Sequence, residues 1–311
     1  MDKTDKIYVA GHRGMVGSAI LRRLEREGYS KIILRTSDEL DLRNQNKVQD
    51  FMEEEKPAYV FLAAAHVGGI GANDKYRAEF FYNNLMIEAN VIHASYLSGV
   101  KKLMFLGSSC IYPKMANQPL KEEYILTGPL ETTNEAYAIA KIAGLKMCEY
   151  YRHQYASNFI SVMPTNLYGS NDNYDLEKSH VLPALLSKFH TARIENKSKV
   201  EVWGTGAPKR EFLHVDDLAD AALFLMQNYD EPGLVNIGTG KDISIMELAN
   251  LIKDIVGFEG DIEFDSSKPD GTPRKLLDVD KLDRLGWHSK IELRQGISEV
   301  YSEIQNMKVL A

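Results

Sequence analysis

A tyrosine and a lysine four residues apart offer one way to protonate a carbonyl while it is reduced. Tyr137 and Lys141 share one face if residues 135–155 form a helix. A lysine ammonium beside a phenol favours the phenolate, so we expect it to lower the pKa of Tyr137 and make the hydroxyl a usable proton donor. A Tyr/Lys pair is also common on protein surfaces. Ser108 favours the catalytic interpretation because it directly follows an apolar run, where open α/β sheets bind their ligands.

A thiol stands close to this serine. In an extended segment, residues two apart point the same way, so Ser108 and Cys110 are expected to face one pocket. Cys148 lies in a helical pattern, is expected to be buried, and is assigned no role. The two cysteines have neither CxxC spacing nor a histidine cluster beside them. This argues against a metal site and a disulfide, and it fits a reducing cytoplasm.

A glycine-rich turn near the N-terminus is typical of a dinucleotide site. Gly11, Gly14 and Gly17 form a GxxGxxG pattern between a short apolar run and an amphipathic segment. Glycines at such a turn let backbone N–H groups and a helix N-terminus approach a pyrophosphate. A simple glycine turn is the alternative. The placement between a predicted strand and a predicted helix favours the dinucleotide site.

Two arginines predict which nicotinamide cofactor binds. NAD-selective sites carry an acidic residue about 20 residues after the glycine loop, at the end of the second strand. Here that strand ends near Arg35, and Arg13 lies in the glycine loop, so both guanidinium groups are candidates to pair with a 2′-phosphate. This favours NADP(H). The alternative is that Arg35 is solvated and Asp38 bonds the ribose hydroxyls.

The composition argues against several classes of protein. The 311 residues carry a net charge of −7, which argues against nucleic-acid binding because duplex affinity needs clustered Lys and Arg. The charged start runs into an apolar stretch at 7–10 that is too short for an export signal. The most apolar stretch, 59–70, falls short of the ~20 residues that a membrane-spanning helix needs.

The order of apolar runs predicts the fold that must position these groups. Short apolar runs alternate with helical patterns: runs at 6–10, 31–35, 59–64, 103–107 and 159–163, helices at 15–27, 43–55 and 135–155. This is the βαβ order of a Rossmann-type, doubly wound α/β fold with a mostly parallel sheet. We expect residues 1–164 to form the NADP-binding domain, with some later segments returning to it.

Residues 165–311 are expected to form mainly a smaller, mixed α/β C-terminal lobe that binds the substrate. Its predicted elements are helices at 180–194, 244–256 and 294–304 and short strands at 200–203 and 234–237. Ser244 followed by Glu247 is typical of a capping box at a helix start. No linker, repeat or low-complexity tract separates the two parts, so we expect one shared interface.

Several of these features together resemble the extended short-chain dehydrogenase/reductase superfamily. The resemblance rests on the glycine loop, residues 62–65, Asn83 with Asn84, Ser108 with Tyr112, and the span from Tyr137 to Lys141. Segments over nearly the whole chain are similar to the members that epimerise and reduce GDP-4-keto-6-deoxy-D-mannose: GHRGMVGSAI, LAAAHVGGI, LGSSCIYPK, PTNLYGSNDNYD, SHVLPALL, GTGAPKREFLHVDD and PDGTPRKLLD.

The resemblance implies a 3,5-epimerisation followed by reduction of the 4-keto group with NADPH, giving GDP-L-fucose. It implies Ser108, Tyr137 and Lys141 as the reductase triad and Cys110 with His180 as the acid/base pair of the epimerisation. Inversion beside a ketone requires a base on one face of the enolate and an acid on the other. Without the resemblance, His180 fits a structural histidine at a helix start equally well.

The resemblance also implies contact residues and an assembly. The implied cofactor contacts are Gly11, Arg13, Gly14, Met15, Val16, Gly17, Arg35, Asp41, Leu42, Ala63, Ala64, Lys141, Pro164, Asn166, Leu167 and His180. The implied substrate contacts are Ser108, Asn166, Lys188, Trp203, Arg210 and Lys275, with Arg210 as the best diphosphate ligand. Asn166 fits a structural role in a turn as well. A homodimer through helices near 83–98 and 135–155 is implied.

One of these positions departs from the family pattern. The family often has two arginines where this chain has Ser187 and Lys188. A lysine is a point charge and cannot make the bidentate contact of a guanidinium, so the diphosphate contact at Lys188 is open.

Two other functions share part of this pattern. A nucleotide-sugar 4-epimerase or 4,6-dehydratase would have the glycine loop and the Tyr/Lys pair. A 4-epimerase needs no α-carbon acid/base pair such as Cys110 and His180, and a dehydratase is expected to carry an acidic residue near Cys110, where none stands. A non-catalytic NADP-sensing protein would typically lack the Tyr/Lys pair, which this chain keeps together with Ser108.

Overall fold

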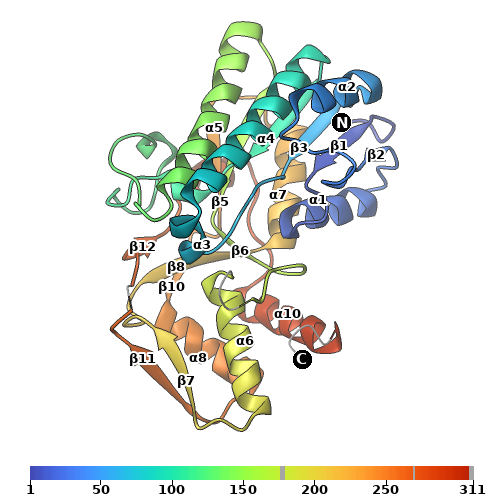
Figure 1. Ribbon diagram of the computed structural model, residues 1–311. Helices are drawn as coiled ribbons and strands as arrows, with labels where there is room; N and C mark the ends of the chain where they lie inside the picture. Colours follow the sequence, from blue (N-terminus) through green and yellow to red (C-terminus); the bar gives the residue numbers. More distant parts are fainter. Residues whose placement is uncertain (176–178, 269, 308–311) are drawn as a thin grey trace.

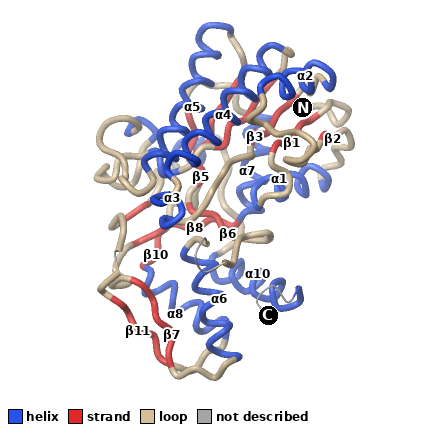
Figure 2. Tube along the Cα trace, in the orientation of Figure 1, coloured by secondary structure: helices blue, strands red, loops and turns tan. Residues whose placement is uncertain are grey.

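The protein has a large parallel sheet with helices on both faces and a smaller part of short strands and helices (Figures 1 and 2). The structure is a computed structural model that describes residues 1–175, 179–268 and 270–307. The segment at 269–278 that carries part of the family resemblance therefore begins on a residue, Pro269, outside the described ones.

Six parallel strands form the main sheet, in the order β2-β1-β3-β4-β5-β9. They are β1 (Ile7–Ala10), β2 (Ile32–Ile33), β3 (Tyr59–Leu62), β4 (Lys102–Leu106), β5 (Phe159–Pro164) and β9 (Leu234–Ile237). Nearly all of their residues are buried, as expected when helices cover both faces of a parallel sheet. The prediction of a Rossmann-type, doubly wound fold is confirmed.

The two faces of this sheet hold separate cores. On one face, α1 (Met15–Arg26) packs beside α7 (Val215–Asn228); on the other lie α2 (Gln45–Glu55), α4 (Arg77–Leu97) and α5 (Glu135–Tyr155) (Figure 1). Successive strand residues point to opposite faces. In β1, Ile7 and Val9 therefore join the α1/α7 core, whereas Tyr8 and Ala10 join the other one.

The smaller part is built around β8 (Lys209–His214). Its neighbours in one sheet are β6 (Asn166–Tyr168), β10 (Asp242–Ser244) and β12 (Arg274–Lys275), while β7 (Lys199–Trp203) pairs with β11 (Asp261–Asp265). Three helices enclose a third core, α6 (Val181–Ile194), α8 (Ile245–Val256) and α10 (Leu293–Met307). Short helices complete the fold at α3 (Ile70–Lys75), η1 (Ser109–Ile111), η2 (Glu122–Tyr124) and α9 (Asp280–Arg284).

The predicted capping box at the start of α8 is confirmed. The Ser244 hydroxyl oxygen accepts the Glu247 N–H at 3.1 Å, and the Glu247 carboxylate accepts the Ser244 N–H at 2.9 Å. Two N–H groups that no helical carbonyl can reach are thus satisfied by the helix start itself.

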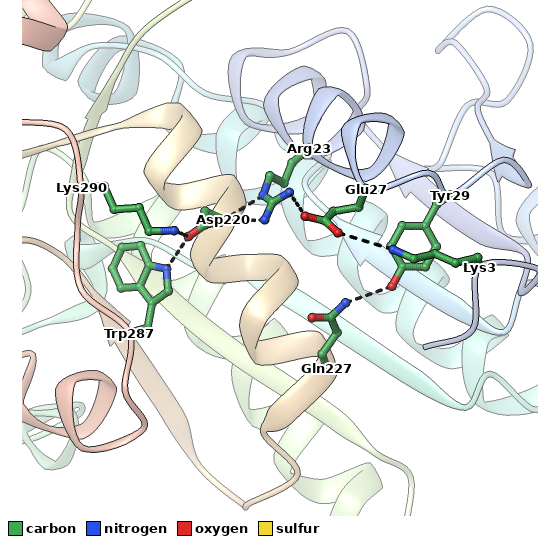
Figure 3. Close-up of polar contacts among 8 residues, drawn as sticks. All are labelled: Lys3, Arg23, Glu27, Tyr29, Asp220, Gln227, Trp287 and Lys290. Atoms are coloured by element: carbon green, nitrogen blue, oxygen red, sulfur yellow. Dashed lines mark hydrogen bonds and ion pairs between the residues drawn. The ribbon is translucent and has the colours of Figure 1, made fainter.

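Polar contacts fasten the C-terminal segment to the first helix (Figure 3). Asp220 of α7 accepts hydrogen bonds from the Arg23 Nε at 3.0 Å, the Trp287 Nε1 at 2.9 Å and the Lys290 Nζ at 2.6 Å. Arg23 belongs to α1, so a single carboxylate joins α1, α7 and the segment before α10.

Among the described residues, no helix is long and apolar enough to cross a membrane.

Two segments differ from the sequence prediction. Residues 234–237 were expected in the smaller lobe but form β9, which pairs in parallel with β5 at the edge of the main sheet. Residues 209–214 were not predicted as a strand because three consecutive charged residues begin β8 and hide its apolar end. The division at residues 164 and 165 stays a prediction.

Candidate active site

The glycine loop lies at the point where the sheet changes direction. β1 is flanked by β2 and β3, and such a switch point opens a crevice at the carboxyl ends of the strands. Gly11 has a φ of 86°, and a Cβ on it would lie 2.7 Å from the Ala64 Cα. A Cβ on Gly17 would lie 2.1 Å from the Gly11 carbonyl oxygen. Because Gly14 starts α1 without a side-chain cap, the helix N–H groups stay open to a pyrophosphate.

The predicted ribose-phosphate ligands lie near the end of β2. Arg13 is exposed in the glycine loop. The Arg35 Nη2 lies 2.7 Å from the Glu55 Oε1, and the Asp41 carboxylate is paired with Arg43 at 2.8 Å. A 2′-phosphate at Arg35 therefore has to compete with Glu55. The apolar cofactor candidates line the cores beneath, Met15, Val16, Ala63 and Leu167 on the α1/α7 side and Leu42 and Ala64 on the other, while Pro164 ends β5.

Ser108, Cys110 and Tyr137 meet at the end of β4. The Ser108 Oγ accepts the Cys110 N–H at 3.3 Å and caps η1. The expected extended geometry of this segment is therefore wrong, because Cys110 sits in a 3₁₀ turn. Tyr137 is 9% exposed, and burial raises its pKa. Negative charge at Cys110 raises that pKa further, whereas a hydrogen bond between Tyr137 and Ser108 lowers it.

Lys141 is engaged by another carboxylate. Its Nζ lies 2.9 Å from the Glu88 Oε1 and donates to the Leu106 carbonyl at 3.1 Å. The same nitrogen lies 5.9 Å from the centroid of the Tyr137 ring. The expected net lowering of the Tyr137 pKa is wrong for this structure. Burial of the phenol raises that pKa, and negative charge at Cys110 and at Glu88 raises it further.

Strands of the smaller part bring two cations to the thiol. Arg210 of β8 and Lys275 of β12 are register partners on parallel strands. The Lys275 Nζ lies 3.5 Å from the Cys110 Sγ, and both residues line a small pocket. Burial lowers the pKa of Arg210. Nearby negative charge at Asp270 and Cys110 opposes this lowering. The structure thus joins the residues near 110, 210 and 275 that the sequence keeps far apart.

His180 lies at the start of α6 as its N-cap residue. His180 is exposed as a residue, but protein groups surround its ring. This desolvation lowers the pKa of His180, with the positive charge of Lys275 as the second cause. Cys148 is 1% exposed, as predicted, and burial raises the pKa of its thiol. Only the first of the two cysteines is therefore placed for chemistry.

The other predicted substrate contacts lie further out on the smaller part. The Lys188 Nζ donates to the Glu201 carbonyl at 3.0 Å and lies 5.4 Å from the centroid of a Trp203 ring. Trp203 is 60% exposed, and the Lys268 Nζ also lies over its ring, 5.6 Å from the centroid. The Asn166 Nδ2 donates to the Glu211 carbonyl at 2.8 Å, which supports the structural role for this amide.

Two buried carboxylates, Glu88 and Glu211, were not predicted as part of the site. Glu211 is fully buried and accepts the backbone N–H groups of Thr239, Gly240 and Leu277 at 2.6, 2.8 and 2.9 Å. It holds the segment that follows Lys275 against β8. The one sequence feature that could have indicated these two residues is their position beside residues of recognised motifs. Glu88 stands four residues after Asn84, and Glu211 stands next to Arg210.

The site combines a glycine loop at a switch point, a Ser/Tyr pair after the fourth strand of the sheet and a lysine one turn beyond the tyrosine. These features together define an extended short-chain dehydrogenase/reductase. Residues 7–238 match the model of the NAD dependent epimerase/dehydratase family, and the chain belongs to that family. Within it, the chain is similar to GDP-L-fucose synthases. It is 59% identical to putative GDP-L-fucose synthase 2 of Arabidopsis thaliana, over 97% of this chain and 92% of that protein.

Two further comparisons agree with this assignment. The chain is 54% identical to GDP-L-fucose synthase of Escherichia coli (strain K12), over 95% of each protein. A solved structure of MlghC, a GDP-mannoheptose C4 reductase from Campylobacter jejuni with NADP bound, has a TM-score of 0.92 and 46% identity, covering 98% of this chain and 99% of that one. The resemblance inferred from the motifs is confirmed.

Proposed function

We propose that this protein converts GDP-4-keto-6-deoxy-D-mannose to GDP-L-fucose by 3,5-epimerisation and NADPH-dependent reduction of the 4-keto group. One observation carries the proposal: the Cys110 thiol shares a site with the Ser108 and Tyr137 hydroxyls and lies 3.5 Å from Lys275. A reductase needs the hydroxyl pair but has no use for the thiol. The identities of 59% and 54% to GDP-L-fucose synthases support the same two reactions.

The first reaction inverts the two carbons that adjoin the 4-keto group. Cys110 is the proposed base that removes a proton from one face, and His180 is the proposed acid that supplies one to the other. The Ser108 and Tyr137 hydroxyls stabilise the enolate oxygen, and the Lys275 ammonium stabilises negative charge near the sulfur. In each inversion the Cys110 thiolate takes up a proton and becomes a thiol, while the His180 imidazolium gives one up and becomes a neutral imidazole. Exchange with solvent restores both groups before the next inversion.

The second reaction reduces the ketone. NADPH, when bound, supplies the hydride. Tyr137 gives its hydroxyl proton to the carbonyl oxygen, Ser108 donates a hydrogen bond to the same oxygen, and the Lys141 charge stabilises the phenolate that forms. The crevice at Gly11 and Gly17, where a Cβ would collide with backbone, fits the pyrophosphate of this cofactor.

The remaining predicted contacts divide between the two ligands. Arg13 and Arg35 are the proposed ligands of the 2′-phosphate of NADP(H). Arg210 and Lys188 are the proposed ligands of the substrate diphosphate, and burial of Arg210 strengthens such a contact. Trp203 is exposed and is the proposed platform for the sugar or the base.

A homodimer and a cytoplasmic location belong to the same proposal. Large apolar side chains are exposed on the adjacent helices α4 and α5, namely Tyr82, Leu97, Ile139, Tyr150 and Tyr155. A second copy of this chain, related by a two-fold axis, would cover them. The proposed chemistry needs Cys110 as a free thiol, which a reducing compartment preserves.

Turnover in heavy water tests the function. With GDP-4-keto-6-deoxy-D-mannose and NADPH, we expect cofactor oxidation together with deuterium at C3 and C5 of a GDP-L-fucose product. Reduction without deuterium would instead indicate a plain C4 reductase, the activity named for the Campylobacter protein. The absence of both cofactor oxidation and deuterium uptake would reject the proposed function altogether.

A further inference from the structure

Glu88 and Lys141 form an ion pair in which both side chains are almost inaccessible to solvent. Their exposed fractions are 1% and 2%, and the Glu88 Oε1 lies 2.9 Å from the Lys141 Nζ. Removing two charges from water carries a large desolvation cost, so a buried ion pair is weak support for a role in stability alone. The lysine of this pair belongs to the proposed reductase site, which raises the question of what the carboxylate does there.

The neighbouring helices make room for this carboxylate. A Cβ on Gly144, which lies on α5 three residues beyond Lys141, would be 2.5 Å from the Glu88 Oε2 and 2.6 Å from the Phe105 Cζ. Glycine lowers the stability of a helix interior, and here its missing side chain leaves the space that the carboxylate occupies. Phe105 closes the site from β4, with its ring centroid 4.8 Å from the Lys141 Nζ.

On α4, the same helix face carries a second positioning contact. Asn84, one turn before Glu88, accepts the His66 N–H at 2.8 Å and donates to the His66 carbonyl at 2.9 Å. It thereby holds the segment that leaves β3 beside the proposed cofactor crevice. Asn84 and Glu88 thus place two parts of the proposed site from one buried helix face.

We propose that Glu88 is a positioning residue for the reduction: it holds the Lys141 ammonium at the end of β4 and balances its charge beside Tyr137. The proposal rests on the proposed function. The titratable groups that face Glu88 are Lys141, Tyr137 and Cys148, all on α5, while β4 contributes the Phe105 ring. Burial raises the pKa of Glu88, and the Lys141 charge opposes that rise. The charged form of the Glu88 carboxylate therefore depends on the neighbouring lysine.

Glu88→Gln tests this role because it keeps the shape of the side chain and removes its charge. An ammonium that loses its counter-ion in a buried site loses its proton more readily or moves away. We expect single-turnover NADPH oxidation to slow by about 10-fold or more. We also expect the alkaline limb of its pH–rate profile to move to lower pH. Deuterium uptake at C3 and C5, which depends on Cys110 and His180, should stay within about threefold of wild type.

Leu145→Ala is the matched control for lost stability. Leu145 is a fully buried neighbour of Gly144 on α5, and its truncation leaves a cavity while both members of the ion pair keep their side chains. We expect this variant to unfold at lower temperature and to keep the wild-type pH–rate profile. If Glu88→Gln behaves in the same way, Glu88 is merely structural and the proposal is overturned.

Glu88→Asp keeps the proposal testable if the glutamine variant does not fold. Aspartate retains the charge but withdraws it by one methylene, so the reduction rate and the alkaline limb should fall between those of wild type and a variant without the charge. A wild-type rate and profile in a destabilised Glu88→Asp protein would reject the positioning role. In wild type, the absence of both NADPH oxidation and deuterium uptake would reject the proposed function instead, so the two failures are distinguishable.

Discussion

Cys110 and Tyr137 share one site but serve different steps of the proposed reaction. Cys110→Ser should lower deuterium uptake at C3 and C5 by at least ~100-fold, because a hydroxyl is a far weaker base than a thiol near neutral pH. NADPH should still bind and be oxidised, which gives a 6-deoxy sugar of the starting configuration. Tyr137→Phe is the reciprocal variant: NADPH oxidation should fall much further than exchange, because exchange keeps its acid/base pair and the Ser108 hydroxyl and loses only one hydrogen bond to the enolate oxygen. Wild-type exchange in Cys110→Ser would assign the base to another residue.

Arg35 is the proposed selector of NADPH over NADH. Arg35→Asp replaces an attractive charge by a repulsive one, so NADPH affinity should fall by about 100-fold or more, with little change for NADH. Glu55→Gln is the matched control, since it removes the carboxylate that lies 2.7 Å from Arg35 and should preserve or tighten NADPH binding. Titrations of both cofactors, followed by fluorescence, decide the question. Equal losses for the two cofactors would exclude Arg35 as the selector.

Asp172 links stability to pH. Burial raises the pKa of Asp172 to about 7, although one of its oxygens accepts the Asn173 N–H at 2.7 Å. A carboxyl whose folded pKa exceeds its ordinary value of 3.8 contributes stability at low pH that is lost as the pH rises through about 7. Asp172→Asn should therefore gain stability relative to wild type between pH 5 and pH 8, measured by urea unfolding at both. A difference that does not change with pH would contradict this assignment.

At the end of α7, one lysine replaces the missing partners of the helix carbonyls. Lys102 is 4% exposed, and its Nζ donates to the carbonyls of Leu225, Met226 and Tyr229 at 3.0, 2.9 and 2.6 Å. The last carbonyls of a helix otherwise lack donors, and a cation there also interacts favourably with the helix dipole. Lys102 lies on β4, so this contact joins α7 to the strand that precedes Ser108.

Lys102→Met should lower the free energy of unfolding by about 2–4 kcal/mol, because it leaves buried carbonyls without donors. The neighbouring Lys101 is the matched control. Its side chain is 60% exposed and pairs with Asp5 at 3.1 Å, and Lys101→Met should lower the free energy of unfolding far less than Lys102→Met does. Chemical denaturation of the two variants gives both values. Equal losses would show that the carbonyl contacts contribute nothing specific.

The whole molecule leaves an apolar surface on α4 and α5, which lie side by side on the outside of the sheet (Figure 1). Ile139→Asp places a charge in the proposed dimer interface and should weaken self-association by about 100-fold or more. Met246→Asp is the matched control, because Met246 is equally exposed, at 44%, on α8 of the smaller part. Sedimentation velocity measures both variants. A wild-type protein that remains a monomer at high concentration would end the proposal of a dimer.

Much of this organisation was readable from neighbours along the chain. The glycine spacing at 11, 14 and 17, the alternation of apolar runs with helical patterns and the capping box at Ser244 are local signals, because turn geometry and helix starts depend on residues a few positions apart. The helix that carries Tyr137 and Lys141 was predicted with the bounds that the structure has. Motif resemblance added Cys110 and His180, whose chemistry no spacing alone indicates.

Contacts between residues that lie far apart in the sequence could not be predicted, because tertiary packing determines them. Glu88 pairs with Lys141 because α4 lies against α5, and Lys275 reaches Cys110 because β12 is in register with β8. Residues 234–237 are a strand of the main sheet because their buried, apolar backbone pairs with β5. In each case the two partners are more than 50 residues apart in the sequence, so the contact forms only when the elements that carry them pack together. The pKa of Tyr137 follows the same rule: the local pair predicted a lowering, whereas burial among distant segments raises it.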